Sequence, residues 1–126
     1  YKWFKDTKTF FDKNEFVMTY VEYPRDKLIT NIKKRIDRMF DSGAIKEVKK
    51  FNLIKINKSN SVNHVIGIKE INSYLSQKAE LNDIKEQILI KTRQYAKRQS
   101  TWSRGHMSNW HKIDPKSKNP FKKILK

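Results

Sequence analysis

The residues best suited to chemistry lie in Thr92–Arg104, a basic run with two aromatic side chains set into it. Lysine and arginine neutralise nucleic-acid phosphates, and a row of them about one helical turn apart suits a phosphate strand. A charged run on a helix is also often only a solvated face, and that alternative stays open here. If the stretch is helical, one stripe holds Arg93, Lys97, Thr101 and Arg104, and the opposite stripe, which we expect to pack, holds Ile88, Tyr95, Gln99 and Trp102.

Other kinds of catalytic and metal chemistry lack their sequence signatures. The chain has only 3 glycines, and none is placed to form a phosphate-binding loop. His64, His106 and His111 do not have the spacing of a helical metal pair, and no G-x-S-x-G nucleophile elbow is present. We therefore expect no catalytic residue and no metal site in this segment.

The composition predicts a single domain with an anionic partner. Of 126 residues, 37% are apolar and 12% aromatic, enough for a modest core. A net charge of +16 favours nucleic acid, an acidic membrane surface or an acidic protein as the partner. The chain has no cysteine, no signal-peptide start and no apolar run near the roughly 18 residues of a membrane span. We expect a soluble cytoplasmic protein.

The elements that must position the basic run begin with a strand and a helix. Glu15–Tyr23 is β-branched, aromatic and almost continuously apolar, which is typical of a strand buried on both faces and implies neighbouring strands. Pro24 fits the first position of a helix that stops near Ser42 and Gly43. That helix should turn one apolar arc inward, formed by Leu28, Ile29, Ile32, Ile36, Met39 and Phe40.

Three further elements complete the predicted organisation. Ala44–Phe51 is a short helix with Ile45 and Val48 facing inward. Asn52–Asn63 is a loop, and Val65–Leu75 has the spacing of a helix around Gly67. The long helix with the basic run should be capped by Asn82 or Asp83 and end near Ser103, before Gly105, and Trp110–Ile113 suits a short strand. The organisation is therefore the end of a preceding element over residues 1–14, a core over 15–114 and a basic tail over 115–126.

Three stretches in this order resemble the C-terminal part of the bacterial tRNA dimethylallyltransferases. Pro24–Val48 is similar to the family's P-R-x-x-L-x-x-R-I-x-x-R-x-x-x-M-x-x-x-G-x-x-x-E-V pattern. H-V-I-G-I-K-E at His64–Glu70 resembles its Q-A-I-G-Y-K-E. T-R-Q-Y-A-K-R-Q-S-T-W-S-R at Thr92–Arg104 resembles T-R-x-Y-A-K-R-Q-x-T-W-x-R, with Trp110 following. The resemblance covers roughly residues 16 to 114.

The resemblance implies transfer of a dimethylallyl group from its diphosphate to N6 of the adenine 3′ of the anticodon. It implies an α/β fold, in which this chain is the mostly helical C-terminal segment of a P-loop nucleotide-kinase-like core, with one buried strand and a possible short C-terminal strand. Mg²⁺ and dimethylallyl diphosphate are implied for the whole enzyme, and neither is expected on this segment alone. The family's diphosphate-binding loop and general-base Asp lie in the N-terminal half, so the segment alone should be inactive.

By match to the family's motifs, the segment supplies contacts to the tRNA anticodon stem-loop. We expect it to be a monomer or to associate with the N-terminal half, and not to bind a membrane. Lys97 and Arg104 should pair with phosphates, whereas Trp102 is a residue type more often buried in a core than used to stack a base. The implied tRNA-binding residues are His64, Val65, Ile66, Gly67, Ile68 and Lys69 in one segment, and Lys97, Arg98, Gln99, Ser100, Thr101, Trp102, Ser103 and Arg104 in the other.

Two departures from the family pattern and two alternatives remain. Ile68 replaces the family's usual Tyr and removes a hydroxyl, and His64 stands where Gln or Arg is common. One alternative is a free-standing basic helical domain that binds RNA or DNA without catalysis. The other is a module on an anionic membrane, which would use the tail with Phe121, Ile124 and Leu125.

Overall fold

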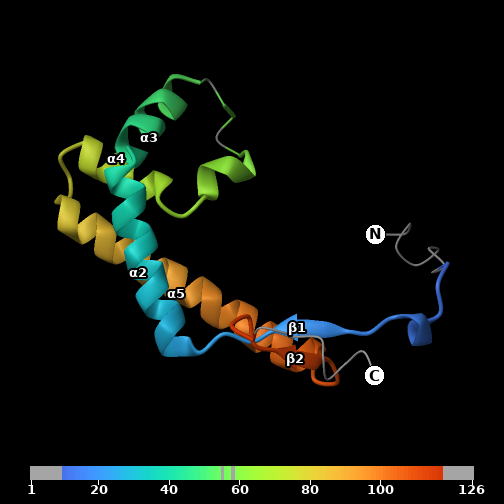
Figure 1. Ribbon diagram of the computed structural model, residues 1–126. Coiled ribbons are helices and arrows are strands. Elements are labelled where there is room, and N and C mark those ends of the chain that lie inside the picture. Colours follow the sequence, from blue (N-terminus) through green and yellow to red (C-terminus); the bar gives the residue numbers. More distant parts are fainter. Residues whose placement is uncertain (1–9, 55, 58, 118–126) are drawn as a thin grey trace. The chain divides into compact units, whose positions relative to one another are not determined.

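The computed structural model describes residues 10–54, 56–57 and 59–117, and it divides into two compact units. The helical unit is Pro24–Arg104, and the strand unit comprises the described residues before and after it, 10–23 and 105–117. In chain order the elements are η1 (Lys13–Glu15), β1 (Thr19–Val21), α2 (Arg25–Asp41), α3 (Ala44–Leu53), η2 (Ser61–His64), α4 (Ile68–Leu75), α5 (Leu81–His106) and β2 (His111–Ile113) (Figure 1).

The first two helices lie close to their predicted positions. Pro24 is the residue before α2 and not its first residue, because its ψ of 128° is extended. Gly43 separates α2 from α3 as predicted, and its φ of 101° is a conformation that glycine adopts without a Cβ penalty. On α3, Val48 is buried and Ile45 partly buried, which confirms the predicted inward face. The helix runs on to Leu53, two residues further than predicted.

The third predicted helix begins later than expected. Val65 and Ile66 precede α4, and Gly67 caps it with a φ of 112°, which is not helical. A short 3-10 turn, η2, occupies the end of the predicted loop. The stretch from His64 to Gly67 is therefore a turn that leads into α4.

The long helix α5 starts earlier and ends later than predicted. It begins at Leu81, so Asn82 and Asp83 lie inside its first turn and do not precede it as caps. It continues to His106, so Gly105 is helical and does not stop it. Glycine disfavours a helix by only about 1 kcal/mol, which hydrogen bonding in a long helix can offset.

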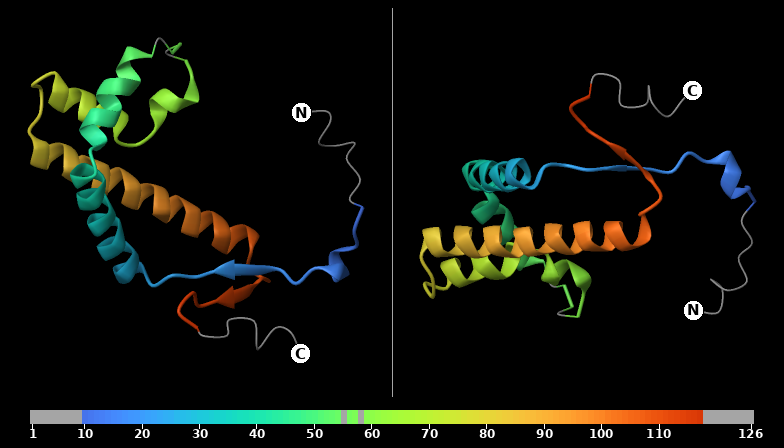
Figure 2. Two further views of the ribbon diagram at one scale, coloured as in Figure 1. Left: turned by 45° about the horizontal axis from the view of Figure 1, so that its top comes forward. Right: turned by 90° about the horizontal axis from the view of Figure 1, so that it is seen from below.

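Two apolar clusters hold the helical unit together, and α5 contributes to both. Ile84 lies in the cluster formed with α3 and α4, and Ile88 lies in the cluster formed with α2. Figure 2 shows α2, α3 and α4 gathered near the first part of α5. The buried members are Ala44, Val48, Ile71 and Ile84 in the first cluster, and Ile32, Ile36 and Ile88 in the second.

The strand unit pairs β1 with β2 in parallel, and Thr19 lies opposite His111 (Figure 2). The short C-terminal strand is confirmed, and it begins one residue later than predicted. The prediction that Glu15–Tyr23 is a strand buried on both faces is wrong for the described residues. Only Thr19–Val21 is a strand, and Val21 is 62% exposed. The reason is that β2 is its one paired strand among the described residues, and nothing described there covers the second face.

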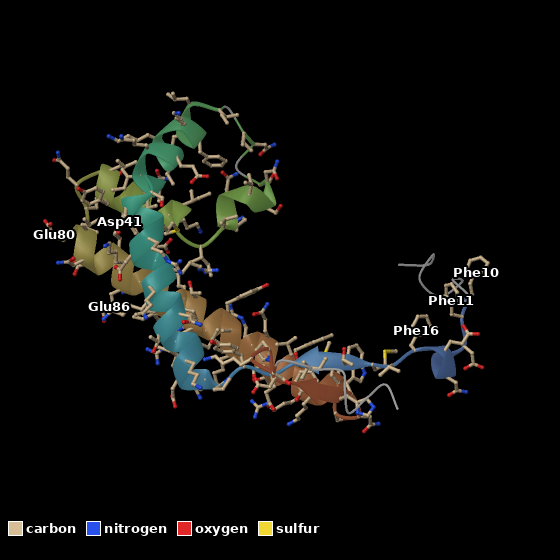
Figure 3. The ribbon with its side chains drawn as sticks, viewed as in Figure 1. Phe10, Phe11, Phe16, Asp41, Glu80 and Glu86 are labelled. Atoms are coloured by element: carbon tan, nitrogen blue, oxygen red, sulfur yellow. The ribbon has the colours of Figure 1, made fainter. Side chains whose placement is uncertain are left out.

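The segments at the two chain ends are described only in part. Residues 1–9 of the predicted preceding element and residues 118–126 of the basic tail lie outside the described residues. Phe10 and the T-shaped pair of Phe11 and Phe16, with ring centroids 5.7 Å apart, are all exposed (Figure 3).

We predict that Gly43→Ala lowers the free energy of unfolding by about 1–2 kcal/mol, because a Cβ strains a residue at positive φ. No heavy atom lies within 4 Å of the position a Cβ would take, so the effect isolates the backbone. Urea unfolding followed by circular dichroism measures it. Gly105→Ala is the matched control and should raise stability by about 0.5 kcal/mol, since this glycine is helical and equally uncrowded. A loss of stability in the control would contradict the helical assignment of Gly105.

Candidate nucleic-acid interface

The basic half of α5 is an exposed surface of one sign. Between Lys91 and Arg104 the sequence has five cationic side chains and no acidic one, whereas Leu81–Ile90 has two acidic residues and one lysine. The predicted basic stripe of Arg93, Lys97, Thr101 and Arg104 is exposed along its whole length. A surface of this kind can bind several phosphates at once.

The opposite stripe of α5 packs only at its beginning. Ile88 is buried as predicted, but Tyr95 is 51% exposed and Trp102 is 54% exposed. Gln99 is exposed as well. The expectation that these three residues pack is therefore wrong, because the two apolar clusters reach α5 only from its start to Ala96. Trp102 is accordingly not a core residue, and its ring presents an aromatic surface of the kind that can stack on a base.

The remaining predicted contacts in this half of α5 also lie on its surface. Arg98 stands over the ring of Tyr95, with its guanidinium carbon 5.8 Å from the ring centroid. Arg104 donates from Nε to the carbonyl of Ser100 at 3.3 Å, so part of its donor capacity stays within the helix. Ser100 and Thr101 are exposed, and Ser103 is partly buried.

The other predicted segment, His64–Lys69, divides into exposed and packed residues. His64, Val65 and Lys69 are exposed. Ile66 packs beside the cluster that contains Ile88, and Ile68 packs beside the cluster that contains Ile84. The side chain that replaces the family's Tyr thus lies against the apolar interior of the helical unit.

Gly67 lies where α4 begins and approaches α5 closely. It is buried, and a Cβ added to it would lie 3.9 Å from Cδ1 of Ile88. That spacing is ordinary van der Waals contact, so a Cβ would fit beside Ile88, and it is the positive φ that favours glycine here. Whether RNA also approaches Gly67 stays a prediction.

Two residues that sequence reasoning did not place in the site join the two predicted segments. The carboxylate of Glu70 is 7% exposed, and its Oε2 accepts the backbone N–H of Gly67 at 2.8 Å. Its Oε1 accepts a hydrogen bond from Nζ of Lys91 on α5. A glutamate three residues after a helix N-cap is the signal of a capping box, and it would have identified Glu70 in the sequence. No sequence spacing links Glu70 to Lys91, 21 residues away.

Burial and charge act in opposite directions on Glu70. Burial alone raises the pKa of this carboxyl group, but hydrogen bonds from Lys91 and from the backbone N–H groups of Glu70 and Gly67 outweigh it, together with the charge of Lys91. The pKa of Glu70 is therefore below its usual value. The residue is ionised in the folded protein near neutral pH.

Within the described residues, no group of three histidine, cysteine or acidic side chains converges to hold a metal ion. These residues therefore do not fit the Mg²⁺ that the family resemblance implies for the whole enzyme. In the part of the chain that the structure covers, no helix combines the length and apolar character needed to cross a membrane.

The lowered pKa of Glu70 predicts a pH-dependent stability. Its ionised form is favoured by folding, so this stabilisation is complete above the unfolded pKa near 4.5 and is lost as the pH falls through the lower folded pKa. We expect wild type to exceed Glu70→Gln in free energy of unfolding by a constant amount, about 1.5 kcal/mol, until roughly pH 5, and by less at lower pH. Urea unfolding from about pH 6 to about pH 3 measures the difference. Lys91→Arg should keep the wild-type profile, and a pH-independent difference would contradict the explanation.

Comparison with known proteins agrees with this arrangement. The family model described as IPP transferase matches residues 1–106. The tRNA dimethylallyltransferase of Pelagibacter ubique is 45% identical over 126 residues, which is 100% of this chain and 40% of that protein. The tRNA dimethylallyltransferase of Acetivibrio thermocellus is 35% identical over 114 residues, which is 90% of this chain and 36% of the relative. The chain thus spans well under half the length of these relatives.

Two solved structures share the fold of the described chain. The full-length tRNA isopentenylpyrophosphate transferase from Bacillus halodurans superposes with a TM-score of 0.68 at 35% identity, over 78% of this chain and 32% of that one. The tRNA delta(2)-isopentenylpyrophosphate transferase from Staphylococcus epidermidis gives a TM-score of 0.69 at 31% identity, over the same shares. With the family model and the sequence relatives, these likenesses establish that the chain belongs to the IPP transferase family.

Proposed function

We propose that this chain is the tRNA-binding portion of a tRNA dimethylallyltransferase. The whole enzyme would move a dimethylallyl group from its diphosphate to N6 of the adenine 3′ of the anticodon, in the cytoplasm, where tRNA is found. The observation that carries the proposal is the acid-free row of five cationic residues on the exposed half of α5, in a chain that belongs to this family.

The chemistry of this surface suits a single-stranded loop better than a regular duplex. Lys97 and Arg104 offer charges to phosphates, and the exposed ring of Trp102 offers a stacking surface of the kind used for unpaired bases. Thr101 is exposed on the stripe of Lys97 and Arg104, and Gln99 is exposed on the stripe of Trp102. Both can donate to or accept from base edges or sugar hydroxyls. Cations, amides and an aromatic ring on one helix are the combination that RNA-loop recognition requires.

The target atom of the proposed reaction explains why the enzyme would need to bind the nucleotides around it. An exocyclic amine in a stacked loop cannot line up with the carbon of the diphosphate ester, so the adenine must leave the stack. Unstacking a base costs a few kcal/mol, and contacts to the flanking nucleotides offset that cost. In this proposal His64–Lys69 and Lys97–Arg104 hold the loop, while the parts of the enzyme outside this chain carry the diphosphate, Mg²⁺ and the general base.

We predict that Lys97→Ala with Arg104→Ala weakens binding to an anticodon stem-loop carrying A beside the anticodon. Removing two phosphate contacts should reduce the slope of log K against log salt by about 1.4 and lower the affinity at least tenfold. Fluorescence anisotropy with the 126-residue chain at several salt concentrations measures both. A scrambled hairpin of equal length reports on binding that ignores sequence.

Lys33→Ala with Lys85→Ala is the matched control for charge. Lys33 on α2 and Lys85 in the first half of α5 line one groove, so the control removes the same charge away from the basic half of α5. The control should bind almost as wild type does. Equal losses in the two double variants, or equal affinity of wild type for both hairpins, would instead favour a generic basic domain.

We also predict that the 126-residue chain alone is catalytically silent. Given tRNA, dimethylallyl diphosphate and Mg²⁺, it should release no diphosphate and attach no dimethylallyl group to the tRNA, because in this proposal the diphosphate-binding loop and the general base belong to other parts of the enzyme. Mass spectrometry of the digested tRNA measures this, with a full-length relative as the positive control. Transfer by the purified chain would refute the assignment of catalysis to other parts of the enzyme.

A further inference from the structure

We propose that Glu70 and Lys91 are positioning residues, which hold the His64–Gly67 turn in fixed register with the basic half of α5 so that RNA meets the two segments as one surface. This inference rests on the proposed function and adds two residues that need not touch RNA. It is carried by the two contacts of one buried carboxylate: Oε2 takes the N–H of Gly67, and Oε1 takes the ammonium of Lys91.

The turn before α4 is held by hydrogen bonds of unequal quality. Val65 N–H reaches the carbonyl of Val62 at 3.3 Å, and Ile68 N–H reaches that of Val65 at 3.3 Å, which is at the long end for such bonds. The bond from Gly67 to Glu70 is 2.8 Å and has a charged acceptor, so it is the stronger constraint. The conformation of the turn therefore depends on where the Glu70 carboxylate is held.

The carboxylate of Glu70 is needed more for its bond to Lys91 on α5 than for capping α4. A capping box works with glutamine as well as with glutamate, because either side chain can accept the N–H at the helix start. The carboxylate becomes necessary through Lys91, because its two oxygens accept from two different donors, the Gly67 N–H and the Lys91 ammonium. Glutamine has one acceptor oxygen, and its NH₂ group would face a donor. Since the Lys91 side chain is 46% exposed, water screens the pair and limits its contribution to stability. Its main consequence is the fixed position of the turn on α5.

The position of the His64–Gly67 turn matters for RNA binding because Lys91 lies close to the basic stripe along α5. Lys91 precedes Lys97 by six residues, which is about 9 Å along a helix axis. Ile66 of the same turn packs against the cluster that contains Ile88, which lies about one helical turn before Lys91 on α5. His64 and Val65, both exposed, are thus held within about two helical turns of the basic stripe.

The test uses a substitution for which simple electrostatics and the positioning role predict opposite changes in RNA affinity. Glu70→Gln removes a negative charge, so simple attraction to phosphate predicts equal or tighter RNA binding. The positioning role predicts about tenfold weaker binding to the anticodon stem-loop, with no loss on the scrambled hairpin. Glu86→Gln is the matched control, because it removes the same charge from an exposed side chain at the start of α5 (Figure 3). It should bind both hairpins as tightly as wild type or slightly tighter.

A second readout reports on the turn without RNA. In Glu70→Gln, hydrogen exchange of the Gly67 amide and of the residues before it should quicken, while the amides of Ile84 and Ile88 keep their wild-type rates. If Glu70→Gln does not fold, Lys91→Gln with Lys91→Arg as its rescue gives the same comparison. The double variant Glu70→Gln with Lys91→Gln should bind no more weakly than the worse single variant, since the pair acts as a unit.

Several outcomes would overturn the inference. One is that the Glu70→Gln variant binds the anticodon stem-loop as tightly as the Glu86→Gln variant does. Another is that Glu70→Gln loses the same affinity for the scrambled hairpin as for the anticodon stem-loop. A salt slope reduced by about 0.7 in Lys91→Gln, with wild-type affinity in Glu70→Gln, would make Lys91 a direct phosphate contact. If wild type shows no preference between the hairpins, the proposed function fails and the inference fails with it. The wild-type measurement alone distinguishes that case.

Discussion

The helical unit depends on the burial of two isoleucines one turn apart on α5. Ile84 closes the cluster of α3 and α4, and Ile88 closes the cluster of α2, so a single helix face joins the other three helices. Truncating a buried isoleucine typically costs about 2–5 kcal/mol, which is a large share of the stability of a small domain. Because these contacts are concentrated in its first half, α5 is anchored at one end and presents its other half to solvent. The scaffold and the exposed basic surface are thus two consequences of one packing arrangement.

Charge follows the same division along α5. Acidic residues collect where α2 ends and α5 begins, as Asp41, Glu80 and Glu86 show in Figure 3. There Lys85 pairs with Asp37 at 3.3 Å and lies over the ring of Phe40, so the local charges largely offset one another. The later half of α5 has no acidic residue. Along α5 itself, attraction for a polyanion is therefore strongest at the exposed later half, which can orient this helix on its partner before any specific contact forms.

The strand unit has far fewer stabilising contacts than the helical unit. A parallel pair of three-residue strands is shorter than an independently stable sheet requires. Lys112 of β2 interacts with Tyr20 of β1 and pairs with Glu22 just after β1. Tyr20 first and Glu22 second raise the pKa of Lys112, but these contacts are exposed to solvent. Val21 of β1 has an exposed apolar side chain, and so do Phe10 and Phe16, which precede the strand in the sequence. The relatives are more than twice as long as this chain, which thus presents only part of the family's length.

The sequence by itself determined the family, the helices and most of the apolar interior, because helical periodicity and glycine stops depend on near neighbours in the chain. Ile32, Ile36 and Val48 were predicted to face inward, and they are buried. Sequence patterns over near neighbours gave wrong predictions where contacts between distant residues determine the structure. Tyr95 and Trp102 were expected to pack, and they are exposed because the two apolar clusters end before them. The start of α4 is a different case, since Glu70, three residues after Gly67, is a local capping signal that marks it. The Glu70–Lys91 pair likewise exists only in the tertiary structure, because folding brings together two charges that are 21 residues apart.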